Sequence, residues 1–193
     1  MVKFTISGIG TDLGPINSGC GFTLSKFEGE TLTFVRRGQK NTTVKVRDII
    51  SNALTYIENN CAASRPCNNY FLGLSKRAPI SLADILKTKT LQIFRLKPPE
   101  DKRLQDLPGG FTFAWGDNYA QIGLNELMLT DTMSAASVLL HELAHVAGAS
   151  GRGEDPKSIA AETALLKCGM RKYFDKDALG MIESVGSDET RFA

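Results

Sequence analysis

The chain has 193 residues, of which 42% are hydrophobic and 23% are charged, and its formal net charge is +2. This composition is typical of one globular domain, for which roughly 150 residues is the usual size, and it excludes a collagen-like chain, a coiled coil and wholesale disorder. The near-neutral balance also excludes the strongly basic footprint of a dedicated nucleic-acid binder. We therefore expect one domain with its own core and no nucleic-acid partner.

Charge and hydropathy vary along the chain. Residues 1–110 carry 16 Lys and Arg against 9 Asp and Glu, whereas residues 111–193 carry 7 against 12. This asymmetry favours a solvated basic face over a basic surface for a substrate or partner.

The first residues lack the apolar core of a signal peptide, and no stretch reaches the ~20 apolar residues of a membrane span. We expect no membrane span, and a location either in the cytoplasm or reached by a route without a cleaved signal.

Short strands and amphipathic helices are expected in the first 110 residues. Apolar residues between 46 and 59 recur at helical spacing, which predicts an amphipathic helix. Ser81 begins a shorter helix as part of a capping box with Asp84. Alternating hydrophobicity predicts the strands of this part, at residues 2–9, 21–26, 31–37 and 91–96.

A hairpin and a series of helices are expected after residue 110. The hairpin turns at Gly116, and a capping signal at Asp131 precedes a helix that stops at Gly148. Asp155 and Pro156 are the favoured start for a further helix, which Gly169 closes. The expected elements are, in order, strands at 111–115 and 119–124, helices at 133–147, 156–168 and 176–184, and a fraying tail at 186–193.

These elements predict a single α+β domain over residues 1–193, in which a strand-rich, mostly antiparallel part at 1–110 precedes a hairpin and helices at 111–185.

The four cysteines have no C-x-x-C spacing, which argues against a thioredoxin motif or a zinc ribbon. Cys61 and Cys67 lie on either side of a turn-forming loop. They are either joined by a disulfide or are two small residues without any bond between them. Cys168 is expected to be a buried helix residue.

The sequence His141-Glu142-Leu143-Ala144-His145 is the motif H-E-x-x-H, and it contains both histidines of the chain. Residues four apart share one face of a helix, so the two imidazoles can bind one metal ion while Glu142 approaches a metal-bound water. A chance match in this composition is expected on the order of 0.001 times. The motif therefore predicts one Zn²⁺ per chain, bound by His141 and His145, with Glu142 as general base.

A hydrolytic zinc site needs a third protein ligand and one open position. Glu162 is the preferred candidate because it lies on the apolar stripe of its helix, where an unpaired carboxylate is costly. Asp155 and then Glu154 follow, although a helix cap explains them without a metal. An extended motif with His or Asp at position 151 is excluded, because that residue is Gly151.

The segment from Ser137 to Gly148, followed by Ala161-Glu-Thr-Ala164, resembles the zincin metallopeptidases, most closely the subgroup with a glutamate third ligand. The resemblance covers the chain from Leu124 to Gly169. It implies a zincin-like domain with an active-site helix followed by a ligand-bearing helix. It also implies that residues 119–125, preceding the active-site helix, are the edge strand that binds substrate antiparallel to itself.

Two patterns of the superfamily are missing. An acidic residue expected four positions after the third ligand is replaced by Leu166, and the chain has no third histidine to stabilise the oxyanion. A tyrosine or arginine must then serve, and Tyr173 is the preferred candidate, followed by Tyr119. The aspartate-ligand subgroup is a weaker match, because its threonine and tyrosine are absent around Asp155.

The resemblance implies a zinc metallopeptidase that hydrolyses peptide bonds in a protein or peptide substrate. A secreted bacterial effector or toxin is favoured over a housekeeping enzyme, and such a protein can have an inhibitor or immunity protein as partner. The alternatives are an aspartate-ligand zincin endopeptidase, an amidase acting on cell-wall peptides and a non-catalytic zinc-binding regulatory module. Glu142 argues against the last, since a purely structural metal site needs no general base.

Overall fold

The structure is a computed structural model that describes residues 2–6, 16–17, 23–34, 42–98, 103–106, 108–150 and 159–170. Its strands are β1 (Phe4–Ile6), β2 (Ile16–Asn17), β3 (Thr23–Ser25), β4 (Thr31–Phe34), β5 (Thr42–Lys45), β6 (Thr90–Lys97), β7 (Gly110–Trp115) and β8 (Tyr119–Leu124). Its helices are α1 (Val46–Tyr56), α2 (Arg65–Gly73), α3 (Leu82–Thr88), α4 (Thr132–Val146) and α5 (Ile159–Lys167). A π-helical turn, η1 (Ile57–Cys61), continues α1, and η2 (Leu104–Asp106) and η3 (Glu126–Thr130) are 3₁₀ turns.

The main sheet is mixed, with the described strands in the order β2-β3-β6-β8-β7. The central strand β6 is parallel to β8 on one side. On its other side, its first residues pair in parallel with β1 and its last residues pair antiparallel with β3. The strands β4 and β5 form a separate antiparallel ribbon. The arrangement confirms the predicted α+β class.

One expectation about the sheet is wrong. The strand β8, which precedes the helix of the H-E-x-x-H motif, is not at the edge but lies between β6 and β7. Among the described strands, the edge position next to β8 belongs to β7, which runs antiparallel to it. Because the two strands of a hairpin are neighbours, sequence patterns cannot tell which of them is outermost; that depends on the long-range pairing of β6 with β8.

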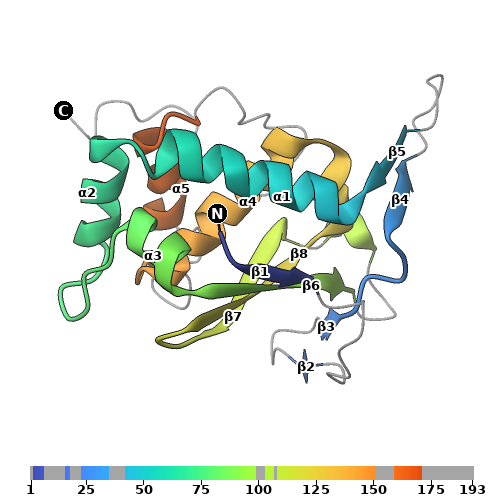
Figure 1. Cartoon of the computed structure of the whole chain (residues 1–193). Helices are drawn as coiled ribbons and strands as arrows, with labels where there is room; N and C mark the ends of the chain where they lie inside the picture. The colour runs from blue at the N-terminus through green and yellow to red at the C-terminus, as the bar shows by residue number, and fades with distance from the viewer. Residues whose placement is uncertain are drawn as a thin grey trace.

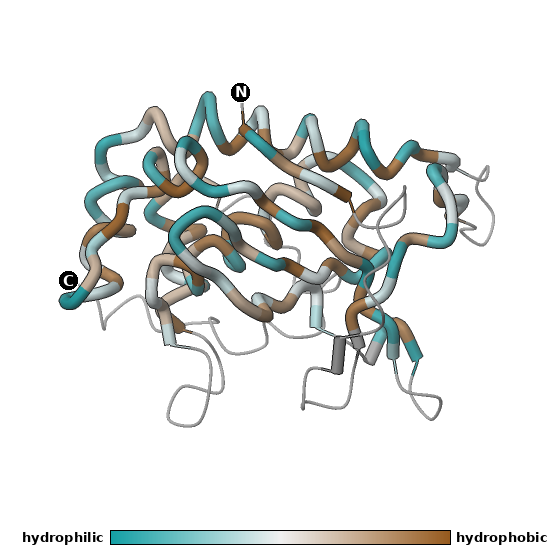
Figure 2. The backbone as a smooth tube through the Cα atoms, turned by 60° about the horizontal axis from the view of Figure 1, so that its bottom comes forward, coloured by the Kyte–Doolittle hydropathy of each residue, from teal (hydrophilic) through white to brown (hydrophobic). Residues whose placement is uncertain are grey.

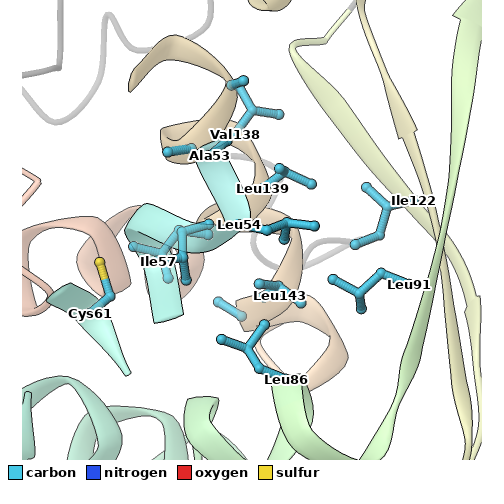
Figure 3. Close-up of a cluster of buried hydrophobic side chains, with 14 of the residues drawn as sticks. Ala53, Leu54, Ile57, Cys61, Leu86, Leu91, Ile122, Val138, Leu139 and Leu143 are labelled. Atoms are coloured by element: carbon cyan, nitrogen blue, oxygen red, sulfur yellow. The ribbon is translucent and has the colours of Figure 1, made fainter. Parts of the chain in front are cut away.

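Helices pack on one face of the sheet, and α4 lies between α1 and the strands (Figure 1). Figure 3 shows the resulting core: Leu91 and Ile122 project from the sheet toward Leu139 and Leu143 of α4, and Leu54 of α1 lies on the far side. All five of these side chains are at most 1% exposed. Hydrophobic and hydrophilic residues alternate along the backbone, as expected for elements with one buried face (Figure 2).

Two of the predicted helix caps, at Asp131 and Ser81, are confirmed. The Asp131 carboxylate accepts the backbone N–H groups of Met133 and Ser134 at 2.9 Å, and so caps the first turn of α4. Gly148 ends this helix with a φ of +108°, a conformation that favours glycine. Ser81 caps α3 by accepting the N–H of Asp84, as the capping box predicts. The hairpin of β7 and β8 is also confirmed.

The helix α2 was not predicted. Of the two alternatives for Cys61 and Cys67, the structure excludes a disulfide between them. Cys67 lies in α2 and forms a disulfide with Cys168, which directly follows α5. Cys61, at the end of the π-helical turn, is a buried free thiol, and burial raises its pKa to about 11. The asparagine-rich sequence of α2 resembles a loop, since Asn has low helix propensity. Its helical form depends on packing against α3 and α5.

Candidate metal centre

His141 and His145 lie on one face of α4, near its C-terminal end, as their spacing predicts. Their Nε2 atoms are 3.2 Å apart, and the two rings meet edge to face with centroids 5.0 Å apart. Both side chains are partly buried. The helix thus brings two nitrogen donors together at one point.

The opposite nitrogen of each ring faces a hydrogen-bond acceptor. Nδ1 of His145 is 3.0 Å from the carbonyl oxygen of Ala149, which follows Gly148 where the chain turns at the end of α4. Nδ1 of His141 is 2.9 Å from Oε1 of Glu162. A carbonyl and a carboxylate can only accept, so each Nδ1 carries the hydrogen and donates.

With both hydrogens on the Nδ1 atoms, the lone pairs of the two Nε2 atoms face each other. Two facing lone pairs repel unless a proton or a cation lies between them. A shared proton or a metal ion bound by both rings satisfies the pair. Burial lowers the pKa of the His141 imidazole, but the hydrogen bond to Glu162 and the charges of Glu142 and Glu162 outweigh it, so the pKa lies above its usual value. The surroundings therefore favour positive charge at this position.

Glu162 reaches His141 from α5, which packs against α4. Its side chain is 12% exposed, and its second oxygen, Oε2, is buried without a hydrogen-bond partner in the described part of the chain. A buried, unpartnered carboxylate oxygen is costly and is available to a cation. The predicted role of Glu162 as third metal ligand stays a prediction, because its observed contact is with Nδ1 and the two nitrogens of an imidazole point to opposite sides of the ring.

Glu142 is directed away from solvent toward β7, and the residue is 3% exposed. Its Oε2 accepts a hydrogen bond of 2.8 Å from the hydroxyl of Thr112. Gly110, on the same strand, provides the room, because a Cβ there would lie 2.8 Å from Oε1 of Glu142 and 2.6 Å from Cγ1 of Val138. The edge strand and the helix are therefore in direct contact at Glu142.

Sequence reasoning missed Thr112 and Gly110. The available signal was the alternation of large and small residues along β7. Phe111 and Phe113 flank a threonine, and this threonine shares its face of the strand with Gly110. A small polar residue on the face that packs against a helix implies a polar partner on that helix. Sequence alone does not identify which helix this is.

Several predicted residues lie outside the described part of the chain: Tyr173, Asp155, Glu154, the helix at 176–184 and the tail at 186–193. Tyr119 is described. It begins β8, is 39% exposed, and its ring lies over Gly116 of the hairpin turn. No group of three or more His, Cys, Asp and Glu side chains with the geometry of a metal site occurs among the described residues. The histidine pair and the nearby Glu162 are thus the candidate centre.

The chain was compared with protein-family models, with curated proteins and with solved structures, and none of them matches it. Within the described residues, no helix is both long enough and apolar enough to cross a membrane.

Proposed function

We propose that this protein is a zinc-dependent metallopeptidase of the zincin type, with one Zn²⁺ per chain bound by His141 and His145. The observation that carries the proposal is the 3.2 Å separation of the two Nε2 atoms while both Nδ1 atoms donate to acceptors. Two nitrogen ligands of tetrahedral zinc, each at about 2.0–2.1 Å, lie about 3.3–3.4 Å apart, and metal-binding histidines usually donate their other N–H to a carboxylate or carbonyl.

Glu162 is the third-ligand candidate that lies within the described residues. In the observed arrangement it orients the His141 ring through Oε1, and Oε2 is the oxygen it can offer to a cation. A catalytic zinc takes three protein ligands and keeps one position for water or substrate. Two partly buried contacts, at Nδ1 of His141 and at Nδ1 of His145, hold both rings in one orientation.

A bound Zn²⁺ supplies Lewis-acid chemistry, since it lowers the pKa of a bound water to around 7 and polarises the scissile carbonyl. Glu142 serves as the general base. Its Oε2 is held by Thr112, while its Oε1 has no hydrogen-bond partner among the described residues. Oε1 can therefore accept a proton from a water and deliver it to the leaving amine. Tyr173 is the candidate donor to the oxyanion, with Tyr119 as the alternative.

The position of β7 supports an extended peptide as substrate. This strand pairs with β8 on one side, and no described strand pairs with its other side. It also carries the two residues that contact Glu142, Gly110 and Thr112. An extended peptide binds such an edge by adding a strand through its backbone groups.

The disulfide between Cys67 and Cys168 supports an oxidising destination, because cytosolic thiols are kept reduced. A secreted effector or toxin has such a destination, and its partner would be an inhibitor or immunity protein. The disulfide thus favours this class over a housekeeping enzyme of the cytoplasm.

Metal analysis and cleavage profiling with a peptide library test the proposal. The wild type should contain zinc, gain thermal stability from added zinc, and cleave peptides. Glu142→Gln should keep the zinc but lose about 10²- to 10⁴-fold in rate, the usual contribution of a general base. Less than about 0.2 zinc per chain, with no stabilisation by added zinc, would reject the metal site. Zinc binding without cleavage would favour the non-catalytic regulatory module.

A further inference from the structure

We propose that Thr112 is a positioning residue that holds Glu142 in the orientation of a general base. This inference rests on the proposed function, because it assigns Thr112 a role through Glu142. The hydroxyl of Thr112 lies 2.8 Å from Oε2 of Glu142 and 3.0 Å from the backbone oxygen of the same residue. A hydroxyl has one hydrogen to donate, and the carboxylate is the nearer and the charged acceptor.

The backbone of β7 fixes where this hydroxyl lies. Thr112 is paired with Ile122 of β8, and Ile122 belongs to the core on the side of the helices. Thr112 therefore points toward α4, and the register of the strand becomes irregular immediately after it, between Thr112 and Ala114. The residue is 9% exposed, so water competes little for its hydroxyl. The donor is held in place by the sheet before any substrate arrives.

The hydrogen bond from Thr112 reaches only one of the two carboxylate oxygens of Glu142. Oε2 is anchored by Thr112, while Oε1 lies near Gly110 and makes no hydrogen bond within the described part of the chain. One oxygen is thus fixed, which leaves the other as the oxygen that would accept a proton from a water in the proposed mechanism. A glutamate without this anchor would sample several rotamers, and most of them would misplace the proton acceptor.

The effect should appear in turnover rather than in substrate or metal binding. Thr112→Val removes the hydroxyl while keeping the β-branched shape, and it should lower kcat about 10- to 100-fold, as expected for the loss of a hydrogen bond to a charged group. KM and zinc content should stay within about twofold of the wild type. Thr112→Ser keeps a hydroxyl and should recover most of the rate.

Thr88→Val is the matched control. It removes a threonine hydroxyl that donates to a backbone carbonyl, that of Asp84, in the helix α3. Its kcat should equal that of the wild type. A double-mutant cycle adds a second check, because Thr112→Val should cost little further rate in a Glu142→Gln background if Thr112 acts through Glu142.

A cycle of unfolding free energies on the metal-free protein tests the contact without any activity measurement. Thr112→Val and Glu142→Ala should be non-additive in stability, because alanine removes the acceptor, whereas the amide oxygen of a glutamine could still accept from Thr112. If Glu142→Gln leaves cleavage intact, the proposed function fails whatever Thr112 does. If Glu142→Gln abolishes cleavage, the Thr112 assignment is overturned by a Thr112→Val variant with wild-type kcat, by a serine variant that does not recover the rate, or by additive effects in either cycle.

Discussion

Cys67 and Cys168 are 101 positions apart in the sequence, and their disulfide joins α2 to the residue that follows α5. The hydroxyl of Tyr70 in α2 also donates to the carbonyl oxygen of Ala160, in the first turn of α5, at 2.8 Å. The helix that brings Glu162 to His141 is therefore attached to α2 near both of its ends.

Reduction of this disulfide should destabilise the protein and the proposed metal site together. A cross-link closing a loop of about 100 residues is worth about 4.7 kcal/mol in the chain-entropy model, and the loss of a native disulfide typically costs about 2–5 kcal/mol. Urea unfolding and zinc titration, with and without reductant, measure both effects. Cys61→Ala is the control, because Cys61 is not part of the disulfide. The reductant should lower the stability of this variant by as much as it lowers that of the wild type. Unchanged unfolding after reduction would contradict this expectation.

Variants of Glu162 should show whether this residue only orients the His141 ring through a hydrogen bond or binds the metal ion itself. If Glu162 acts by orienting the ring, Glu162→Ala should weaken zinc binding by about 10- to 100-fold, the usual effect of losing such a partner. Glu162→Gln should lose less, because an amide oxygen can still accept the hydrogen of Nδ1. Competition against a zinc chelator gives the affinities, with His145→Ala as the reference for loss of a ligand. A loss for Glu162→Ala as large as that reference would show that Glu162 binds the metal directly.

Gly110→Ala should disturb the contact between β7 and α4. The new Cβ would lie 2.6 Å from Cγ1 of Val138 and 2.8 Å from Oε1 of Glu142, so one of these side chains must move. Overpacking of this kind costs about 1–3 kcal/mol of unfolding free energy, and chemical denaturation measures it. Gly73→Ala is the control, because a Cβ there has no heavy atom within 4 Å. Equal stabilities of the two variants would argue against the close approach at Gly110.

The cap at Asp131 should contribute a pH-dependent part of the stability. Burial raises the pKa of this carboxyl, but hydrogen bonds from Ser134, Met133 and Thr130 outweigh it, so the pKa lies below its usual value. A carboxyl with a lowered pKa in the folded state stabilises the fold above its unfolded pKa, and this contribution disappears as the pH falls through the folded pKa.

Asp131→Ala should therefore cost about 0.5–2 kcal/mol at neutral pH. The difference from the wild type should shrink as the pH falls through the range below about 4, the usual pKa of an unfolded aspartate, and unfolding curves at a series of pH values measure it. A cost that is constant over this range would mean that the charge of Asp131 does not contribute.

The sequence by itself determined the local features of this protein. Residues four apart in H-E-x-x-H must share a helix face, because 3.6 residues make one turn, and this is enough to bring His141 and His145 together. The caps at Ser81 and Asp131 and the end of α4 at Gly148 also follow from nearby residues. Each of these interactions joins groups within a few positions of each other, so sequence patterns can predict them.

Only the tertiary structure decided which distant residues meet. It paired Cys67 with Cys168, brought Glu162 to Nδ1 of His141, and placed β7 rather than β8 at the sheet edge. It also directed the hydroxyl of Thr112 to Glu142, across 30 positions of sequence. Such contacts depend on how whole elements pack, since burying one apolar face against another selects the neighbours of a helix or strand, and local patterns do not encode that choice.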